Sequence, residues 1–148
     1  MTTGRVNLKV VGDLLQGVED CLTGLRSLPA GSQEEFTADF RNPAAAESFL
    51  RRAIQGLFDI LRHLLAKGYG QGALEYKELA RLAAEKDLIR DPALAEVLRK
   101  LGGFRNRLTH FYQEVTAGEL YGILRGELGD VEGIAAELRA AAIRVSQA

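Results

Sequence analysis

One short stretch of the chain combines four residue types that are useful in acid–base and phosphate chemistry. Arg105, Asn106, His110 and Tyr112 fall within eight consecutive positions. Because an α-helix turns by about 100° per residue, these side chains, with that of Thr109, would share one side of a helix. Histidine titrates near neutral pH and suits proton transfer, whereas arginine stays charged and presents two N–H groups to phosphate oxygens. The stretch therefore predicts a helix face that can move protons beside a phosphate group.

The spacing of three of these residues resembles a known ribonuclease motif. Arg105, four further residues, His110, one residue and Tyr112 are similar to the Arg-x4-His-x-Tyr motif of the HEPN ribonuclease superfamily, specifically of its HepT-like toxin branch. The Gly-Phe-Arg-Asn segment that leads into the motif looks like that branch as well. The resemblance extends from about Arg41 to about Leu138. It implies an all-α ribonuclease that acts as the toxin of a toxin–antitoxin pair.

The resemblance implies cleavage of RNA without a metal, which needs three kinds of group. One group takes the proton of the 2′-hydroxyl, one protonates the leaving 5′-oxygen, and a positive charge stabilises the phosphorane between them. His110 would do the proton work and Arg105 the electrostatic work, while Asn106 would hold the imidazole or contact the scissile phosphate. The expected products are a 2′,3′-cyclic phosphate and a 5′-hydroxyl. One helix offers a single histidine, so we expect two motif helices to face each other in a homodimer with a shared cleft.

A regulatory role for Tyr112 also follows from the resemblance. The tyrosine of the motif resembles the acceptor for AMP groups that a small cognate nucleotidyltransferase antitoxin, of the MntA type, adds to HepT-like toxins. An AMP group on Tyr112 would place phosphate charge beside Arg105, occupy the cation that RNA needs, and block the cleft. We therefore expect an MntA-like nucleotidyltransferase as a partner of this chain.

Each motif residue has an ordinary interpretation when it is taken alone. Arg105 would be a surface cation, and His110 a solvated histidine or one at the edge of the core. Asn106 would be an exposed polar residue, and Tyr112 a buried ring with its hydroxyl at the rim. The combination of residue types, their spacing and their shared face favour the functional interpretation for Arg105 and His110.

The motif must be positioned by a helix that we expect from Pro92 to about Val115. Asp91 and Pro92 form a typical start, with a capping side chain before a proline at the first helical position. Apolar residues on the opposite side of this helix are spaced by three and four positions: Val97, Leu101, Phe104, Leu108, Phe111 and Val115. Gly102 and Gly103 interrupt the helix, and we expect them to allow close contact with a second copy of the chain.

Two further long helices are predicted on the N-terminal side of the motif. The first runs from about Val6 to Leu28. The second starts with Asn42 as its N-cap and Pro43 as its first helical residue, and it ends at the glycine-rich segment 68–72. Their apolar stripes predict that both helices pack into one core.

Asp59 and His63 lie four positions apart on the second of these helices, close enough to pair with each other. The resemblance places an aspartate and a histidine here and makes both candidates to support the active cleft. A structural role for His63 is the favoured alternative, because no other histidine or cysteine offers itself as a metal partner.

Shorter helical segments complete the expected fold. One runs from about Tyr76 to Leu88, and a last segment opens with a capping box that joins Thr116 and Glu119. No stretch alternates apolar and polar residues with a period of two over the length of a strand. We therefore predict an all-α, HEPN-like antiparallel bundle of five to six helices, forming one domain over residues 1–148 and a homodimer through the motif helix.

Composition and charge narrow the class of protein. With 148 residues, 47% hydrophobic and 26% charged, the chain has the composition of an ordinary globular domain. The net charge of −1 gives no overall sign of nucleic-acid binding, although basic side chains gather on the motif helix: Arg99, Lys100, Arg105 and Arg107. A single cysteine, Cys21, excludes an internal disulfide and a cysteine-based zinc site, and we expect no metal or cofactor. No apolar stretch approaches the roughly 18 residues that span a bilayer, so we expect a cytoplasmic protein.

These observations lead to one main hypothesis and two alternatives. The main hypothesis is a metal-independent ribonuclease toxin, neutralised by a nucleotidyltransferase partner. In the rival interpretation the same bundle is a non-catalytic substrate-binding or docking subunit of a small nucleotidyltransferase. A purely structural helical adaptor is a third, weaker alternative, since it leaves the clustered polar face unexplained.

Overall fold

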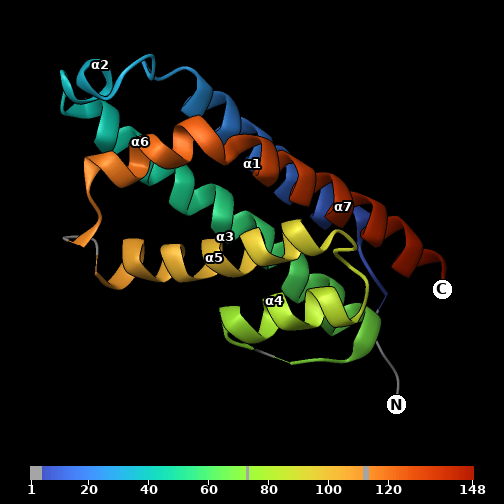
Figure 1. The fold of residues 1–148 in the computed structure, drawn as a ribbon. Helices are drawn as coiled ribbons and strands as arrows, with labels where there is room; N and C mark the ends of the chain where they lie inside the picture. Colours follow the sequence, from blue (N-terminus) through green and yellow to red (C-terminus); the bar gives the residue numbers. More distant parts are fainter. Residues whose placement is uncertain (1–4, 73, 112–113) are drawn as a thin grey trace.

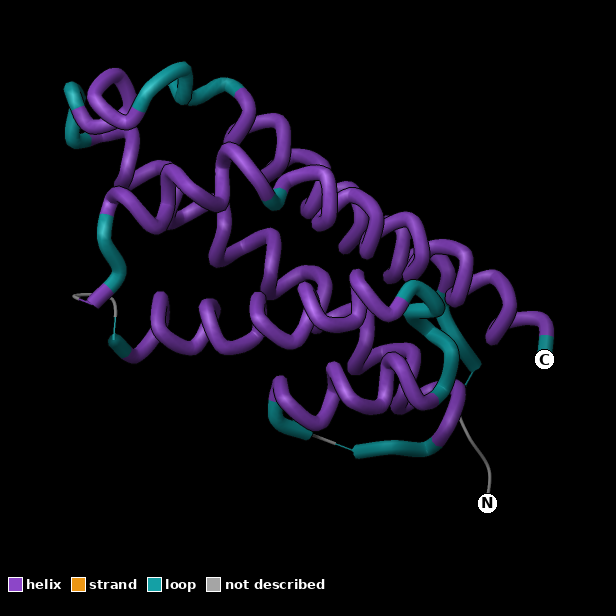
Figure 2. The backbone as a smooth tube through the Cα atoms, viewed as in Figure 1, coloured by secondary structure: helices purple, strands orange, loops and turns teal. Residues whose placement is uncertain are grey.

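The chain folds into helices and short connections throughout the part that the structure describes. The computed structural model describes residues 5–72, 74–111 and 114–148. The helices in these ranges are α1 (Leu8–Arg26), α2 (Gln33–Thr37), α3 (Arg41–Tyr69), α4 (Tyr76–Glu85), α5 (Pro92–His110), α6 (Ala117–Gly126) and α7 (Leu128–Gln147). Figures 1 and 2 show no strand among the described residues, which confirms the predicted all-α fold. None of the described helices is both long and apolar enough to cross a membrane.

The predicted count of five to six helices is too low because of the short helix α2. Ser32 caps this helix by accepting the backbone N–H of Glu35 at 3.1 Å. Phe36 is its one buried residue, and the Phe36 ring centre lies 6.1 Å from that of Tyr121 on α6. A five-residue helix contains too few apolar positions to show a period of 3.6 in the sequence.

Helix α3 forms the centre of the bundle and packs against α1, α5 and α7. Its buried residues recur at three- and four-residue spacings: Ala46, Leu50, Ala53, Ile54, Leu57, Phe58, Ile60, Leu61, Leu64 and Leu65. Full burial of each large apolar side chain contributes about 1.5–3 kcal/mol, so this stripe is a main source of stability. In Figure 1 the long helices α1, α3, α5 and α7 alternate in direction, as expected for an antiparallel bundle.

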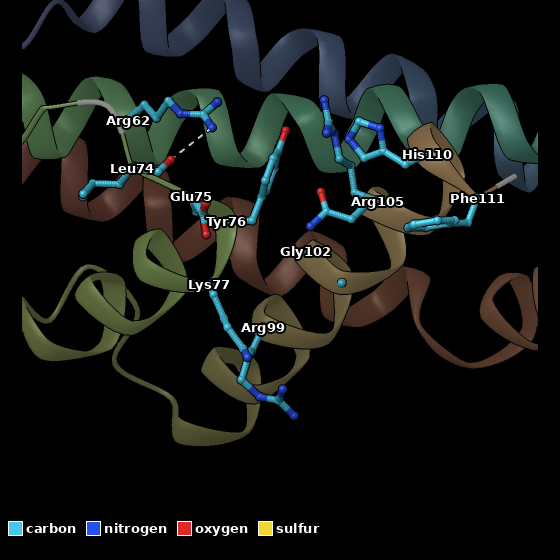
Figure 3. Close-up of a pocket in the computed structure, with 12 residues that line it drawn as sticks. Arg62, Leu74, Glu75, Tyr76, Lys77, Arg99, Gly102, Arg105, His110 and Phe111 are labelled. Carbon is cyan, nitrogen blue, oxygen red and sulfur yellow. Dashed lines mark hydrogen bonds between the residues drawn. The ribbon is translucent and has the colours of Figure 1, made fainter.

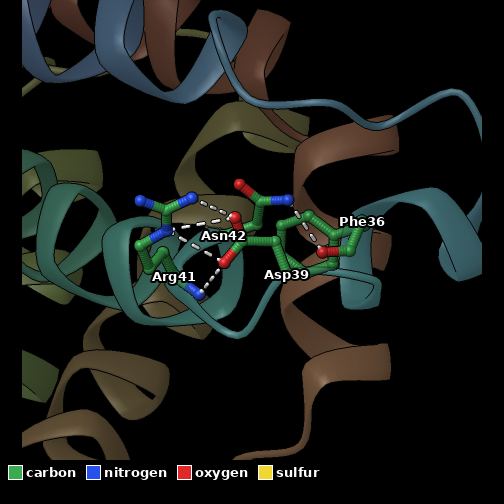
Figure 4. A network of polar contacts seen from close by, with 4 residues as sticks. All are labelled: Phe36, Asp39, Arg41 and Asn42. Atoms are coloured by element: carbon green, nitrogen blue, oxygen red, sulfur yellow. Dashed lines mark hydrogen bonds and ion pairs between the residues drawn. The ribbon is translucent and has the colours of Figure 1, made fainter.

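The start of α3 differs from the prediction. Arg41, rather than Pro43, is the first helical residue, because Asp39 accepts the backbone N–H of Arg41 at 2.9 Å. The Asp39 carboxylate also binds the Arg41 guanidinium, which lowers the pKa of Asp39 to about 2. The predicted N-cap, Asn42, lies inside the helix and donates a 3.1 Å hydrogen bond to the carbonyl of Phe36 (Figure 4). The side chain that binds a free backbone N–H at the start of α3 is therefore that of Asp39, and not that of Asn42 as predicted.

The end of α3 agrees with the predicted glycine stop. Gly70 has φ 66°, in the left-handed region that glycine adopts without strain. Its N–H bonds to the carbonyl of Ala66 at 3.2 Å, and the N–H of Gln71 bonds to that of Leu65 at 3.0 Å. The last turn of α3 is thus closed, and the chain turns back toward α4 and Tyr76.

Gly102 permits a close approach of α5 to the rest of the same chain. A Cβ atom at this position would lie 3.1 Å from the ring of Phe58 and 3.3 Å from the Cβ of Tyr76. Gly102 itself is buried, whereas Gly103 is exposed and has open space around the position of a Cβ. The sequence suggested a contact with a second copy at this pair, but the close contact of Gly102 is intramolecular.

Helix α5 ends at His110, five residues before the predicted end at Val115. Phe111 leaves the helical conformation with φ −132° and ψ 40°. In the last turn of α5, the guanidinium of Arg107 binds both carboxylate oxygens of Glu119 on α6 at 2.7 and 3.0 Å. Phe111 was predicted in the apolar stripe but is 57% exposed, because its position no longer follows the helical period.

Candidate active site

Three of the four motif residues line one cleft between α4 and α5. The cleft has a volume of about 780 Å³ and includes Arg105, Asn106 and His110. Figure 3 shows the side chains of Arg105 and His110 extending from α5 in the same direction. The other lining residues are Arg62, Leu74, Glu75, Tyr76, Lys77, Arg99, Gly102, Gly103 and Phe111. The fourth motif residue, Tyr112, lies outside the described residues.

Arg105 is held by two residues that the motif does not include. Its Nε and Nη2 donate hydrogen bonds of 3.1 and 2.8 Å to the side-chain oxygen of Gln55 on α3. Its guanidinium carbon lies 4.6 Å from the centre of the Tyr76 ring, which is a cation–π distance. Both partners are remote from Arg105 in sequence, so residue spacing gave no sign of either. They define where the guanidinium lies in the cleft.

Arg105 differs from neighbouring arginines because its partners are uncharged. Arg99 forms a 2.6 Å ion pair with Glu96. The hydrogen bond between Arg107 and Glu119 raises the pKa of the Arg107 guanidinium and lowers that of the Glu119 carboxyl. Among the described residues, no carboxylate lies within ion-pair distance of Arg105. The charge of Arg105 is therefore available to an incoming phosphate.

Asp59 is connected to Arg105 through Gln55. The side-chain nitrogen of Gln55 donates a 2.8 Å hydrogen bond to Asp59 Oδ1. The same oxygen lies 3.6 Å from Nη1 of Arg62, whose Nη2 donates to the carbonyl of Leu74 at 3.3 Å (Figure 3). Asp59 was expected to support the cleft. It does not line the cleft, but one glutamine side chain separates it from Arg105.

His63 is bound elsewhere and does not pair with Asp59. Its Nε2 accepts a 2.9 Å hydrogen bond from the backbone N–H of Asn7, just before α1. Within the described ranges no hydrogen bond or ion pair joins His63 to Asp59, so the predicted pair is not formed. Partial burial and, to a smaller extent, the charge of Lys67 lower the pKa of His63. In this structure His63 attaches the start of α1 to α3.

We expect the contact between His63 and Asn7 to weaken in acid. Only the neutral ring accepts the Asn7 N–H, and the pKa of His63 in the folded chain lies below its ordinary value of 6.5. The stabilisation is therefore complete above this ordinary value and is lost as the pH falls through the lower, folded-state value. Hydrogen exchange of the Asn7 amide, corrected for its intrinsic pH dependence, should show less protection near pH 5 than near pH 8.

The matched control for this prediction is His63→Phe, which keeps a ring but cannot accept the hydrogen bond. Its Asn7 amide should exchange quickly at both pH values. Equal protection of Asn7 in the native chain at both pH values would contradict the assignment of this contact.

His110 is the last residue of α5 and is exposed. Its ring centre lies 6.5 Å from that of Phe111, and the two planes make an angle of 71°. The chain has only two histidines, and the other, His63, is bound to Asn7. One copy of the chain therefore places a single imidazole in the cleft. A reaction that needs a separate acid and base requires another group or a second copy.

The cleft offers an imidazole, a guanidinium and, at Asn106, an exposed amide that precedes His110 by one turn. Over the described part of the chain, no group of three or more histidine, cysteine, aspartate or glutamate side chains is placed to hold a metal ion. The chemistry that these side chains supply is proton transfer and binding of phosphate.

Comparisons with known proteins relate both the sequence and the structure to one family. The family model described as "Ribonuclease HepT-like" matches residues 18–138. No curated protein matches the sequence. The structure is similar to a chain of the tri-AMPylated Shewanella oneidensis HEPN toxin in complex with MNT antitoxin, with a TM-score of 0.78, 22% identity, and coverage of 88% of this chain and 97% of that chain. A chain of a toxin–antitoxin crystal structure with AMP-PNP has a TM-score of 0.77 and 21% identity, covering 87% of this chain and 97% of that chain.

Proposed function

This chain belongs to the HepT-like ribonuclease family, and on that premise we propose that it is a metal-independent endoribonuclease toxin. The observation that most supports this proposal is the uncompensated charge of Arg105 in the same cleft as His110 and Asn106. A cation that has no carboxylate partner among the described residues, in the same cleft as an imidazole, provides the electrostatic and the proton-transfer parts of RNA cleavage.

The three cleft residues have separate roles in the proposed reaction. Arg105 binds the scissile phosphate and stabilises the charge that builds up on its oxygens as the 2′-hydroxyl attacks. His110 transfers protons between the 2′-hydroxyl, solvent and the leaving 5′-oxygen. Asn106 donates its amide N–H groups to a phosphate oxygen or orients the imidazole. The bond from the 2′-oxygen to phosphorus forms as the bond to the 5′-oxygen breaks, which gives a 2′,3′-cyclic phosphate and a 5′-hydroxyl.

Basic side chains at the α4 end of the cleft give the RNA a path beyond the scissile bond. Arg62, Lys77 and Arg99 line this end, with Glu75 as the one acidic lining residue among those described. Lysine and arginine side chains along a groove bind backbone phosphates independently of sequence. We expect a single strand to lie along α5 from His110 toward Lys77.

A homodimer would complete the active cleft. One chain places one imidazole in the cleft, whereas cleavage uses an acid and a base at once. Two copies with their motif helices facing each other would provide two imidazoles and two guanidinium groups. In this arrangement the exposed ring of Phe111, beside His110, would be covered by the second copy.

The proposed antitoxin is a small nucleotidyltransferase that adds AMP to Tyr112. The similar toxin of Shewanella oneidensis was solved in a tri-AMPylated form with its MNT antitoxin. Tyr112 is two positions after His110, so an added phosphate would lie near the cleft and compete with RNA for Arg105. We expect co-expression with an MntA-like nucleotidyltransferase to give a mass increase of one or more AMP groups that map to Tyr112, and to abolish cleavage.

Tyr112→Phe is the matched control for this modification, because it removes only the hydroxyl that would accept AMP. The variant should stay active and toxic in the presence of the nucleotidyltransferase. AMP found on other residues only, or an unmodified native chain that is still neutralised, would contradict the role of Tyr112.

Cleavage of a defined RNA by the purified chain in the presence of EDTA tests the proposed activity. We expect cleavage fragments that end in a 2′,3′-cyclic phosphate, detected by mass spectrometry. A 2′-deoxy nucleotide at the cleaved position should abolish cleavage there, because the attacking hydroxyl is missing. Products with a 3′-hydroxyl, or cleavage of the deoxy substrate, would contradict the proposed mechanism.

A further inference from the structure

The partners of Arg105 suggest how the chain keeps this cation both fixed and charged. A guanidinium has five N–H donors, and two of them are donated to the side-chain oxygen of Gln55. The remaining three are left for other acceptors. Because Gln55 is neutral, it fixes one edge of the guanidinium and leaves its positive charge in place. A carboxylate in the same position would offset that charge.

The orientation of the Gln55 amide is itself determined by its neighbours. Its oxygen accepts the Tyr76 hydroxyl at 2.6 Å in addition to the two bonds from Arg105. Its nitrogen donates to the carboxylate of Asp59, and a carboxylate offers acceptors but no donor. If the amide were flipped, its nitrogen would face the donors of Arg105 and its oxygen would face the Asp59 carboxylate. Asp59 therefore ensures that the oxygen of Gln55 points to Arg105.

Tyr76 forms a platform on which Arg105 lies. The Tyr76 ring packs edge-on against the fully buried ring of Phe58, with centroids 4.5 Å apart at 71°. Arg62 lies 5.1 Å from the same ring, and Figure 3 shows Tyr76 between Arg62 and Arg105. The missing Cβ of Gly102 lets α5 approach the Phe58 ring and the Cβ of Tyr76. The platform is thus held by the core and by α5.

We propose that Gln55 and Tyr76 are positioning residues that hold Arg105 ready for the scissile phosphate, with Asp59 fixing the Gln55 amide. This inference rests on the proposed ribonuclease function. Holding the side chain in place before substrate arrives removes the cost of ordering it during the reaction. A neutral anchor also leaves the full positive charge for the transition state.

The decisive variant moves one negative charge from position 59 to position 55, one helical turn away. In Gln55→Glu/Asp59→Asn, the new carboxylate accepts the bonds from Arg105 and Tyr76, and the new amide at position 59 donates to it. The shape and net charge of the network are retained, but Arg105 is paired with a carboxylate. Asp59→Asn alone is the matched control, because Arg62 loses the same partner in both variants while Gln55 stays neutral.

We expect the double variant to have a kcat lower than that of Asp59→Asn by about ten-fold or more, at equal thermal stability. A structural role of Gln55 alone would predict equal kcat in these two variants. As a second measurement, Gln55→Leu removes the anchor and should lower kcat by roughly 10- to 100-fold with little change in KM, since misplacement of a transition-state group affects the chemical step.

The two proposals fail in different ways. Equal kcat for the double variant and Asp59→Asn, in a native chain that cleaves RNA, would overturn the positioning role and leave the ribonuclease function intact. An undiminished kcat of Gln55→Leu would overturn it as well. No cleavage by the native chain and by Asp59→Asn, with both folded, would instead overturn the proposed function.

Discussion

Arg105→Ala and His110→Ala are each expected to abolish growth inhibition when the chain is expressed alone in a bacterial host. Removing Arg105 takes away the one cleft cation on α5 that has no carboxylate partner among the described residues. Loss of such a transition-state donor typically costs roughly 10²–10³-fold in rate. Removing His110 takes away the imidazole in the cleft, and a general acid–base group contributes roughly 10²–10⁴-fold.

The matched control is Lys100→Ala, which removes one positive charge from the same helix. Lys100 is exposed and does not line the cleft, so this variant should inhibit growth and degrade RNA as the native chain does. All chains are compared at equal expression, with total RNA examined at the same time. Normal growth and intact RNA with the native chain would favour the rival hypothesis, in which this chain is a non-catalytic docking subunit of a nucleotidyltransferase.

The elements with strong periodicity could be predicted from the sequence, and those fixed by single polar contacts could not. Helix α3 shows its apolar stripe over many turns, and its glycine stop is equally visible. The start of α3 was misplaced because a carboxylate at Asp39, rather than the amide of Asn42, binds the first free N–H. The end of α5 was misplaced because Phe111 and Val115 continue an apolar pattern that the backbone does not follow.

The candidate site shows the same division. The sequence singled out Arg105, Asn106 and His110 as candidates, and the structure brings these three residues to one cleft. Gln55 and Tyr76 were missed, because they lie 50 and 29 positions from Arg105, and contacts at such separations follow from how α3, α4 and α5 pack and leave no local pattern. Spacing alone placed His63 within reach of Asp59, but its observed partner is the backbone N–H of Asn7, which fits the structural role that the sequence favoured for His63.

An excess of inactive chain is expected to suppress the activity of the native chain, if two copies share one cleft. The shared cleft of a mixed dimer of native chain and the Arg105→Ala/His110→Ala variant contains a single imidazole, and so lacks either the acid or the base. With a nine-fold excess of variant and random pairing, about one tenth of the native chains pair with another native chain. RNA cleavage per native chain should therefore fall about ten-fold when the two are co-expressed and purified together.

The control for this experiment replaces the inactive chain by Lys100→Ala, which pairs in the same way and keeps both motif residues. Mixed dimers that contain it should cleave RNA at the native rate. Different affinity tags on the two chains show directly how many mixed dimers are present. If mixed dimers with the inactive chain form and cleavage per native chain stays constant, each chain contains a complete site. The second proton-transfer group would then have to come from the same chain, and the shared cleft would be wrong even if the ribonuclease activity is real.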